Sequence, residues 1–280
     1  MDLWHAVVLS VIQGLTEFLP VSSSGHLVLG ARLFGLQNPS LTFSIWVHVG
    51  TAFATIVMLR EKIYLILSGL FFPKSIEEKK RCFSIAAYVV AASIPAGIVG
   101  LALEEKIDAY FSSSLAASVG LIITGCILCL SKSLSTGRST GDSKPLSAQS
   151  SLLGTVTLQK SIAVGVSQAV AIVPGISRSG TTITTGLLSG MSRQDAAEFS
   201  FLLSLPAVLG AAFLDVLTAI KTQRPVIESI ALMGAFISFI VGLGALRIVF
   251  ATIEKGELHK FSYYCWIVGT LGVVLSLLVP

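Results

Sequence analysis

The sequence predicts an all-α integral membrane protein built as an inverted repeat, each half with one re-entrant helix–loop–helix and three transmembrane helices. Hydrophobic residues make up 53% of the 280 residues and charged residues 12%, with a mean hydropathy of +0.85. A soluble globule of this length cannot bury so much apolar surface. Six apolar runs suit membrane crossing, and one polar, glycine-containing pattern occurs once in each half.

The six runs are close to or above the roughly 20 residues that a helix needs to cross the hydrocarbon layer. They are Leu41–Leu59, Phe83–Leu103, Leu115–Leu130, Phe199–Ile220, Val226–Phe250 and Phe261–Val279. Two shorter runs, Leu3–Leu19 and Ser161–Val173, are each followed by proline, glycine and serine and then by a second short apolar run. Because irregular backbone is tolerated at membrane depth only inside protein or beside a cavity, this order predicts two re-entrant hairpins.

The two hairpin segments match each other without a gap at an offset of 155 residues. The identical pairs are Val11/Val166, Gln13/Gln168, Ser22/Ser177, Ser24/Ser179, Gly25/Gly180 and Gly35/Gly190. Three spans per half is an odd number, so the second copy is inverted and the hairpins meet near the midplane. The predicted organisation is a single membrane domain over 1–280, with a first repeat at 1–131, a cytoplasmic linker at 132–159 and a second, inverted repeat at 160–280.

Lysine and arginine mark the cytoplasmic side of a membrane protein. The Arg60–Arg81 connection contains six of them, whereas Glu104–Tyr110 contains one lysine among three acids. We therefore expect the first connection and the linker inside, and the second connection and both termini outside. The net charge of +4 is modest and lies in loops, which argues against nucleic-acid binding. The common NTPase, zincin and serine-hydrolase motifs are absent from the sequence.

Residues capable of chemistry gather at the turn of the first hairpin. Gln13 and Glu17 are four apart and share a helix face, and an ionisable side chain within an apolar segment is a candidate functional residue. The polar run Ser22–His26 opens a helix expected near Leu27. Serines there cap helices, yet a helix start also binds anions. His26 can transfer protons near neutral pH, and a neighbouring serine can be a nucleophile if His26 or a carboxylate activates it.

Arg178 is the corresponding candidate in the second hairpin. It stands between two serines, after a Pro-Gly break and before a helix expected near Thr181. A guanidinium at membrane depth fits a bidentate clamp on phosphate or carboxylate. Its alternative partner is Glu17, in a structural ion pair across the two hairpins. Both roles are compatible if the pair persists until substrate or metal arrives.

Both segments resemble the signatures of a known family. The stretch QGLTEFLPVSSSGH at Gln13–His26 and the stretch PGISRSG at Pro174–Gly180 closely resemble the two motifs of the bacterial undecaprenyl-diphosphate phosphatase family, also called the bacitracin-resistance protein family. The resemblance covers nearly the whole chain. Where other members carry two glutamates, this chain has Gln13 and Glu17, which puts in doubt any metal scheme that needs both carboxylates.

The resemblance implies a metal-dependent hydrolase of the bacterial cytoplasmic (inner) membrane, with its active site on the periplasmic side. The enzyme would remove the terminal phosphate of the lipid undecaprenyl diphosphate, recycle undecaprenyl phosphate for cell-wall (peptidoglycan) synthesis and confer bacitracin resistance. The implied cofactor is a divalent metal, Mg²⁺ or Ca²⁺. The implied catalytic residues are Glu17 (also the metal ligand), Ser22, Ser23, His26 and Arg178, and the implied substrate-binding residues are Gln13, Ser24, Gly25, Ser177, Ser179, Gly180 and Thr182.

Several alternatives stay open from the sequence. An inverted-repeat transporter or lipid flippase is the rival function, since broken helices at the midplane also suit transport. The attacking group is Ser22, Ser23 or a metal-bound water, and a homodimer is a further open alternative. A second class of membrane lipid phosphatases has Ser-Arg, five residues and then histidine, but Thr184 stands at that position, which excludes it. His48 lies in a predicted span where it could line the cavity, and no pattern assigns it a role.

Overall fold

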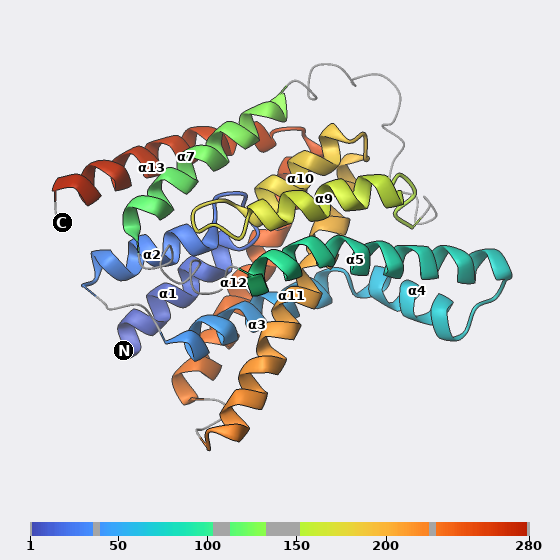
Figure 1. Cartoon of the computed structure of the whole chain (residues 1–280), viewed down its shortest axis with the longest axis horizontal. Helices are drawn as coiled ribbons and strands as arrows, with labels where there is room; N and C mark the ends of the chain where they lie inside the picture. Colours follow the sequence, from blue (N-terminus) through green and yellow to red (C-terminus); the bar gives the residue numbers. More distant parts are fainter. Residues whose placement is uncertain (1, 36–39, 103–112, 133–151, 224–227, 279–280) are drawn as a thin grey trace.

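The computed structural model describes residues 2–35, 40–102, 113–132, 152–223 and 228–278, and every regular element in these ranges is a helix (Figure 1). The helices are α1 Leu3–Thr16, α2 Ser23–Leu33, α3 Leu41–Met58, α4 Arg60–Phe71, α5 Ile76–Ala102, α7 Ser114–Leu130, α9 Leu158–Val170, α10 Arg178–Leu188, α11 Arg193–Lys221, α12 Ser229–Glu254, the 3₁₀ helix η1 Leu258–Lys260 and α13 Phe261–Leu278. The all-α prediction is therefore confirmed for the described residues.

Long apolar helices make this chain a multi-pass membrane protein. Within the described ranges, the segments long and apolar enough to cross a membrane are Leu41–Met58, Ile76–Ala102, Arg193–Lys221, Ser229–Glu254 and Leu258–Leu278. The remaining predicted span forms α7, which is apolar but has only 17 residues. Large apolar side chains point outward from these helices; Leu101 is 78% exposed and Phe236 65% exposed. Such a surface needs lipid around it.

The connection predicted between Arg60 and Arg81 contains helical structure that hydropathy did not reveal. α4 fills its first half, and α5 begins at Ile76 rather than near Phe83. Charged residues in the first turns of both helices explain the difference, because they lower local hydropathy without opposing helix formation. α4 packs along α5, and the two project together from the rest of the molecule (Figure 1).

Parts of the predicted topology lie outside the described residues. They are the Glu104–Tyr110 connection, residues 133–151 of the predicted linker, and the end residues Leu103, Val226 and Val279 of three predicted spans. The described end of the linker leads into α9, which begins at Leu158 rather than Ser161.

The two halves of the chain pack crosswise. α1 of the first hairpin packs on α12, and α9 of the second packs on α5. In the same way α3 packs on α12 and α11 packs on α5, while α7 and α13 lie side by side (Figure 1). Each hairpin therefore packs against a long helix from the other half. This packing places the two hairpin turns in the middle of the molecule.

Positions that align between the halves form the same capping contacts, although Ser22 has a positive φ of 68° and Ser177 has a φ of −70°. Ser22 is the N-cap of α2 and Ser177 is the N-cap of α10, and each Oγ accepts a hydrogen bond from the backbone N–H three residues later. After these helices, Gly35 (φ +64°) and Gly190 (φ +81°) both take the left-handed conformation that favours glycine. The residues that are identical in the two halves therefore form an N-cap and a glycine-containing helix end in each half.

The second helix of each hairpin begins earlier than the sequence predicted, directly after its N-cap serine. α2 begins at Ser23 rather than near Leu27, and α10 begins at Arg178 rather than near Thr181. An N-cap serine satisfies one of the free amides of the first turn, so polar residues can form that turn. The candidate residues Ser23, Ser24, His26, Arg178 and Ser179 consequently lie on helical backbone at the hairpin turns, directly after the two N-cap serines.

The hairpin turns meet through glycines. A Cβ added at Gly25 would lie 3.0 Å from Gly175 Cα, and one at Gly175 (φ +87°) would overlap Ala117 O of α7. Thr124 of α7 fastens the second turn, because its Oγ1 donates to Gly175 O (2.8 Å) and accepts from Ser177 N (2.8 Å). Close backbone contact between the turns positions their polar side chains.

Candidate active site

A buried ion pair between Glu17 and Arg178 joins the two hairpins. Glu17 stands at the C-terminal end of α1 with its side chain 5% exposed, and Arg178 opens α10 with its side chain 24% exposed. Arg178 Nη2 donates to Glu17 Oε1. The ion pair predicted as an alternative from the sequence is confirmed. Because an unpaired buried carboxylate is strongly unfavourable, the pair holds both side chains at the junction.

The other carboxylate oxygen of Glu17 is also engaged. Gln13 Nε2 donates to Glu17 Oε2 at 2.9 Å, which confirms that these two residues share a helix face. Ser23 Oγ donates to the same oxygen at 2.7 Å, and His48 Nε2 of α3 lies 3.6 Å from it. A serine hydroxyl whose hydrogen points at a carboxylate is the arrangement of a nucleophile with its general base.

Gln13 supplies an oxygen that suits a cation. Its side chain is fully buried, and no described residue donates a hydrogen bond to its Oε1. A buried carbonyl oxygen without a partner is unfavourable, and amide and carboxylate oxygens are the ligands that hard divalent ions take. The described residues contain no group of three His, Cys, Asp or Glu side chains that could hold a metal alone. Gln13 and Glu17 therefore fit a divalent ion whose other ligands come from elsewhere.

His26 is held from both sides of its ring. Nδ1 lies 2.8 Å from Ser22 O, and because a carbonyl only accepts, Nδ1 carries the hydrogen. Nε2 then accepts from the hydroxyl of Tyr264 at 2.8 Å, and the two rings stack with centroids 5.6 Å apart. Tyr264 comes from α13 and was not among the predicted site residues. Its contact fixes the orientation of His26, whose tautomer is set by Ser22 O.

The remaining predicted residues of the first hairpin lie around this centre. Ser22 is buried and its Oγ caps α2, accepting from Gly25 N at 3.3 Å. The hydroxyls of Ser22 and Ser24 are 3.2 Å apart, and Ser24 is partly exposed. Ser23 is therefore the serine of this turn whose hydroxyl reaches the carboxylate.

The predicted residues of the second hairpin form a matching hydroxyl cluster. Ser177 Oγ caps Gly180 N at 3.0 Å and lies 3.3 Å from Ser179 Oγ. Ser179 Oγ reaches back to the first hairpin, to Leu19 O at 3.5 Å. The Thr182 hydroxyl pairs with Ser200 Oγ of α11 at 2.5 Å, so it also ties α10 to α11.

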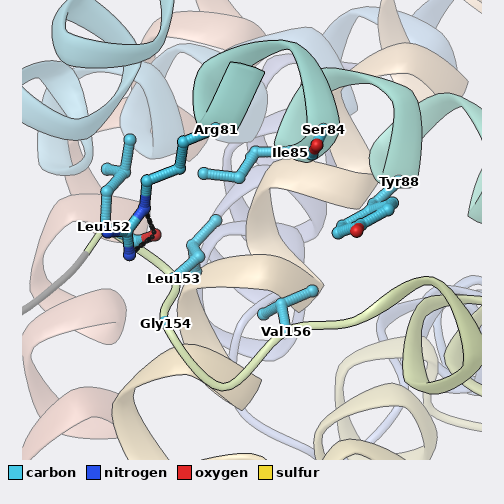
Figure 2. Close-up of a pocket in the computed structure, with 8 residues that line it drawn as sticks. All are labelled: Arg81, Ser84, Ile85, Tyr88, Leu152, Leu153, Gly154 and Val156. Atoms are coloured by element: carbon cyan, nitrogen blue, oxygen red, sulfur yellow. Dashed lines mark hydrogen bonds between the residues drawn. The ribbon is translucent and has the colours of Figure 1, made fainter. Parts of the chain in front are cut away.

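A hollow lies beside the first half of α5, and none of the candidate residues named above lines it (Figure 2). Its lining is Arg81, Ser84, Ile85, Tyr88, Leu152, Leu153, Gly154 and Val156. Arg81 is the charged member, and its Nε and Nη2 both donate to Leu152 O, at 3.2 and 2.7 Å (Figure 2). The guanidinium is used to hold the 152–156 segment against α5, and the hollow offers no nucleophile beside a base. The hairpin junction is the better candidate for chemistry.

Comparison with known proteins shows the family to which the chain belongs. The model of the family described as bacitracin resistance protein BacA matches residues 6–271. An undecaprenyl-diphosphatase from Desulforapulum autotrophicum is 38% identical over 98% of each chain. Undecaprenyl-diphosphatases from Korarchaeum cryptofilum and Bacteroides fragilis are also each 38% identical, over 99% of this chain and 100% and 99% of theirs. The matched region contains every residue of the candidate site, and the chain belongs to the bacitracin resistance protein BacA family.

Proposed function

We propose that this protein is an undecaprenyl-diphosphate phosphatase, which removes the terminal phosphate of the carrier lipid and returns undecaprenyl phosphate to cell-wall synthesis. Full-length similarity to curated undecaprenyl-diphosphatases supports this function. The observation that carries it is the junction of Glu17, Ser23 and Arg178, in which one carboxylate contacts both a hydroxyl and a guanidinium. By removing undecaprenyl diphosphate, the enzyme would lower sensitivity to bacitracin.

The ion pair is the resting state of the site. A diphosphate offers Arg178 several oxygens in the planar geometry that a guanidinium binds best. When Arg178 turns to the phosphate, Glu17 Oε1 is released while Oε2 keeps its hydrogen bond with Ser23. Substrate binding thus converts a structural carboxylate into a general base, and the remaining serine hydroxyls of both turns face the same anion.

Ser23 is the nucleophile in this proposal. Its Oγ attacks the terminal phosphorus while Glu17 takes the hydroxyl proton, and the bond from that phosphorus to the bridging oxygen breaks. Undecaprenyl phosphate leaves with the bridging oxygen. Water then attacks the phosphoserine, with His26 Nε2 as the proton acceptor once it has left the Tyr264 hydroxyl. The bond from phosphorus to Ser23 Oγ breaks, Glu17 returns its proton to that oxygen, and inorganic phosphate is released. Phosphoryl transfer needs positioning and charge neutralisation above all, and the hairpin junction supplies both.

A divalent ion completes the proposed site. Gln13 Oε1 and Glu17 would hold it together with oxygens of the diphosphate, because protein side chains and substrate phosphates commonly share such ions. When bound, the ion withdraws charge from the phosphoryl oxygens. Because the protein offers only one carboxylate at this position, the substrate must supply further oxygen ligands for the ion.

We further propose an inverted repeat with six spans, α7 being the sixth, in the cytoplasmic membrane. The crosswise packing of α1 on α12 and α9 on α5 supports the repeat. The basic connection between α3 and α5 would face the cytoplasm, and the first hairpin would open to the outer face. In a background without the four native cysteines, an impermeant thiol reagent should label Ser24→Cys from outside and Lys79→Cys only from inside. Labelling of Ser24→Cys from the cytoplasm alone would reverse the orientation.

Phosphate release by the purified protein tests the function. With undecaprenyl diphosphate in mixed micelles, the wild type should release one phosphate per lipid, and Arg178→Ala should release almost none. Arg60→Ala is the matched control, because Arg60 is an exposed arginine of α4 that bonds to Val57 O. A pure transporter or flippase would release no phosphate and would instead move labelled lipid between leaflets.

A further inference from the structure

His48 reaches the centre of the candidate site although no motif includes it. It lies in α3, and its Nε2 is 3.6 Å from Glu17 Oε2. Its Nδ1 lies 2.7 Å from Ser44 O, one helical turn earlier. Because a carbonyl oxygen only accepts, Nδ1 carries the hydrogen, and in the neutral ring Nε2 presents its lone pair to the site.

The contact between Nε2 and Glu17 brings two acceptors together. A lone pair facing a carboxylate oxygen at 3.6 Å is unfavourable, and either a proton on Nε2 or a metal ion near both atoms relieves the contact. Metal-bound histidines almost always donate their other ring N–H to a carbonyl or a carboxylate, as His48 does to Ser44 O. Two ligands that each lie about 2.1 Å from one ion are roughly 3 to 3.6 Å apart. Gln13 Oε1, buried and without a donor among the described residues, belongs to the same junction.

We propose that His48 is a nitrogen ligand of the divalent ion and makes this site prefer transition-metal ions, such as Mn²⁺, to Mg²⁺ and Ca²⁺. The inference rests on the proposed function, which supplies the ion and the diphosphate. Mg²⁺ and Ca²⁺ bind oxygen almost exclusively, whereas imidazole adds affinity for first-row transition ions. A mixed set of one nitrogen and two oxygens therefore differs from the all-oxygen set that the motif alone suggests.

The charges at the junction couple ion binding to substrate. Glu17 is already paired with Arg178, and the described residues offer no group of three acidic, histidine or cysteine ligands. A divalent ion beside this neutral pair gains little attraction from the protein alone. A diphosphate brings several negative charges, so the ion and the substrate should bind together.

Electron paramagnetic resonance with Mn²⁺ as the probe tests the inference on the full-length protein in detergent. The measurement is made with and without the methylene-bridged analogue of farnesyl diphosphate, which cannot be hydrolysed. Wild type should bind one Mn²⁺ per chain tightly only with the analogue, and its spin-echo spectrum should contain the modulation from a coordinated imidazole nitrogen. In His48→Gln, which keeps an oxygen ligand, that modulation should vanish and the Mn²⁺ over Mg²⁺ preference should fall about tenfold.

A control variant and the possible outcomes distinguish failure of the His48 proposal from failure of the proposed function. His5→Gln should leave the spectrum and the preference unchanged, because His5 pairs with Asp2 at the start of α1. Wild type that binds Mn²⁺ without nitrogen modulation, or His48→Gln with an unchanged preference, would overturn the role of His48 while the phosphatase function stands. The wild-type spectrum decides this even if the variant fails to fold. Absence of any bound ion would overturn the ligand proposal, whereas absence of phosphate release with every divalent ion would overturn the proposed function itself.

Discussion

Replacing Arg178 with alanine should lower the free energy of unfolding as well as abolish turnover, because the change leaves the buried Glu17 carboxylate without its ion-pair partner. Glu17 is 5% exposed and keeps only Gln13, Ser23 and the nearby His48 as partners once the guanidinium is gone. Removing one partner of a fully buried ion pair costs about 3 to 5 kcal/mol. Arg178 is 24% exposed, so water can enter the space that it leaves, and we expect a loss of about 2 to 3 kcal/mol.

A double-mutant cycle with Glu17→Gln isolates the pair. Glu17→Gln removes the charge and retains an oxygen for Arg178, so we expect a loss of about 1 to 2 kcal/mol. The double variant has no buried charge at the junction and should be more stable than Arg178→Ala alone. The two single losses should therefore exceed the double loss by more than the Glu17→Gln loss itself, that is by about 2 kcal/mol. Phosphate release should fall about 1000-fold or more in all three variants.

The assay is equilibrium unfolding in mixed micelles, followed by the fluorescence of the three tryptophans, together with phosphate release from undecaprenyl diphosphate. Losses that add within about 0.5 kcal/mol would show that the two side chains are not coupled. The ion pair would then not join the hairpins, and the proposed exchange of Glu17 for substrate would have no basis.

Four further variants test individual roles. Ser23→Ala should lose phosphate release about 1000-fold, whereas Ser22→Ala should mainly lower stability by about 1 kcal/mol through the lost cap; the reverse pattern in the two assays would make Ser22 the nucleophile. Gln13→Glu should stay active and bind divalent ions about tenfold more tightly, and a dead enzyme would show that the amide itself is needed. Tyr264→Phe keeps the ring on His26 but removes the hydroxyl, so kcat should fall about tenfold and its pH profile should move with KM little changed; an unaltered profile would make the contact purely structural.

The sequence predicted the contacts at the centre of the candidate site because they are local or lie in repeated segments. Gln13 and Glu17 lie one helical turn apart, so helix periodicity alone places them together. The contact between Glu17 and Arg178 spans 161 residues, yet it was predictable because both residues interrupt aligned apolar segments, where charge needs a partner. The serine caps were predictable because serines at helix starts commonly cap them, although the helices begin a few residues earlier than expected.

Contacts that depend on packing between helices distant in the sequence could not be predicted from the sequence. Tyr264 touches His26 across 238 residues, and a tyrosine in an apolar span has many uses besides an active site. His48 reaches Glu17 only because α3 packs against α1. Thr124 holds the second turn from α7, and nothing in its own surroundings in the sequence distinguishes it from other span threonines. The position of such residues follows from the crossing of the two halves, which periodicity does not specify.

Hydrolysis in isotopically labelled water tests most directly whether the hairpin junction cleaves the terminal phosphate of undecaprenyl diphosphate. Purified wild type should place the heavy oxygen in inorganic phosphate and none in undecaprenyl phosphate, as read by mass spectrometry of both products, because attack occurs at the terminal phosphorus. Arg178→Ala should yield neither labelled product. Heavy oxygen in the lipid phosphate, or equal label release by wild type and Arg178→Ala, would contradict cleavage at the junction of Glu17, Ser23 and Arg178.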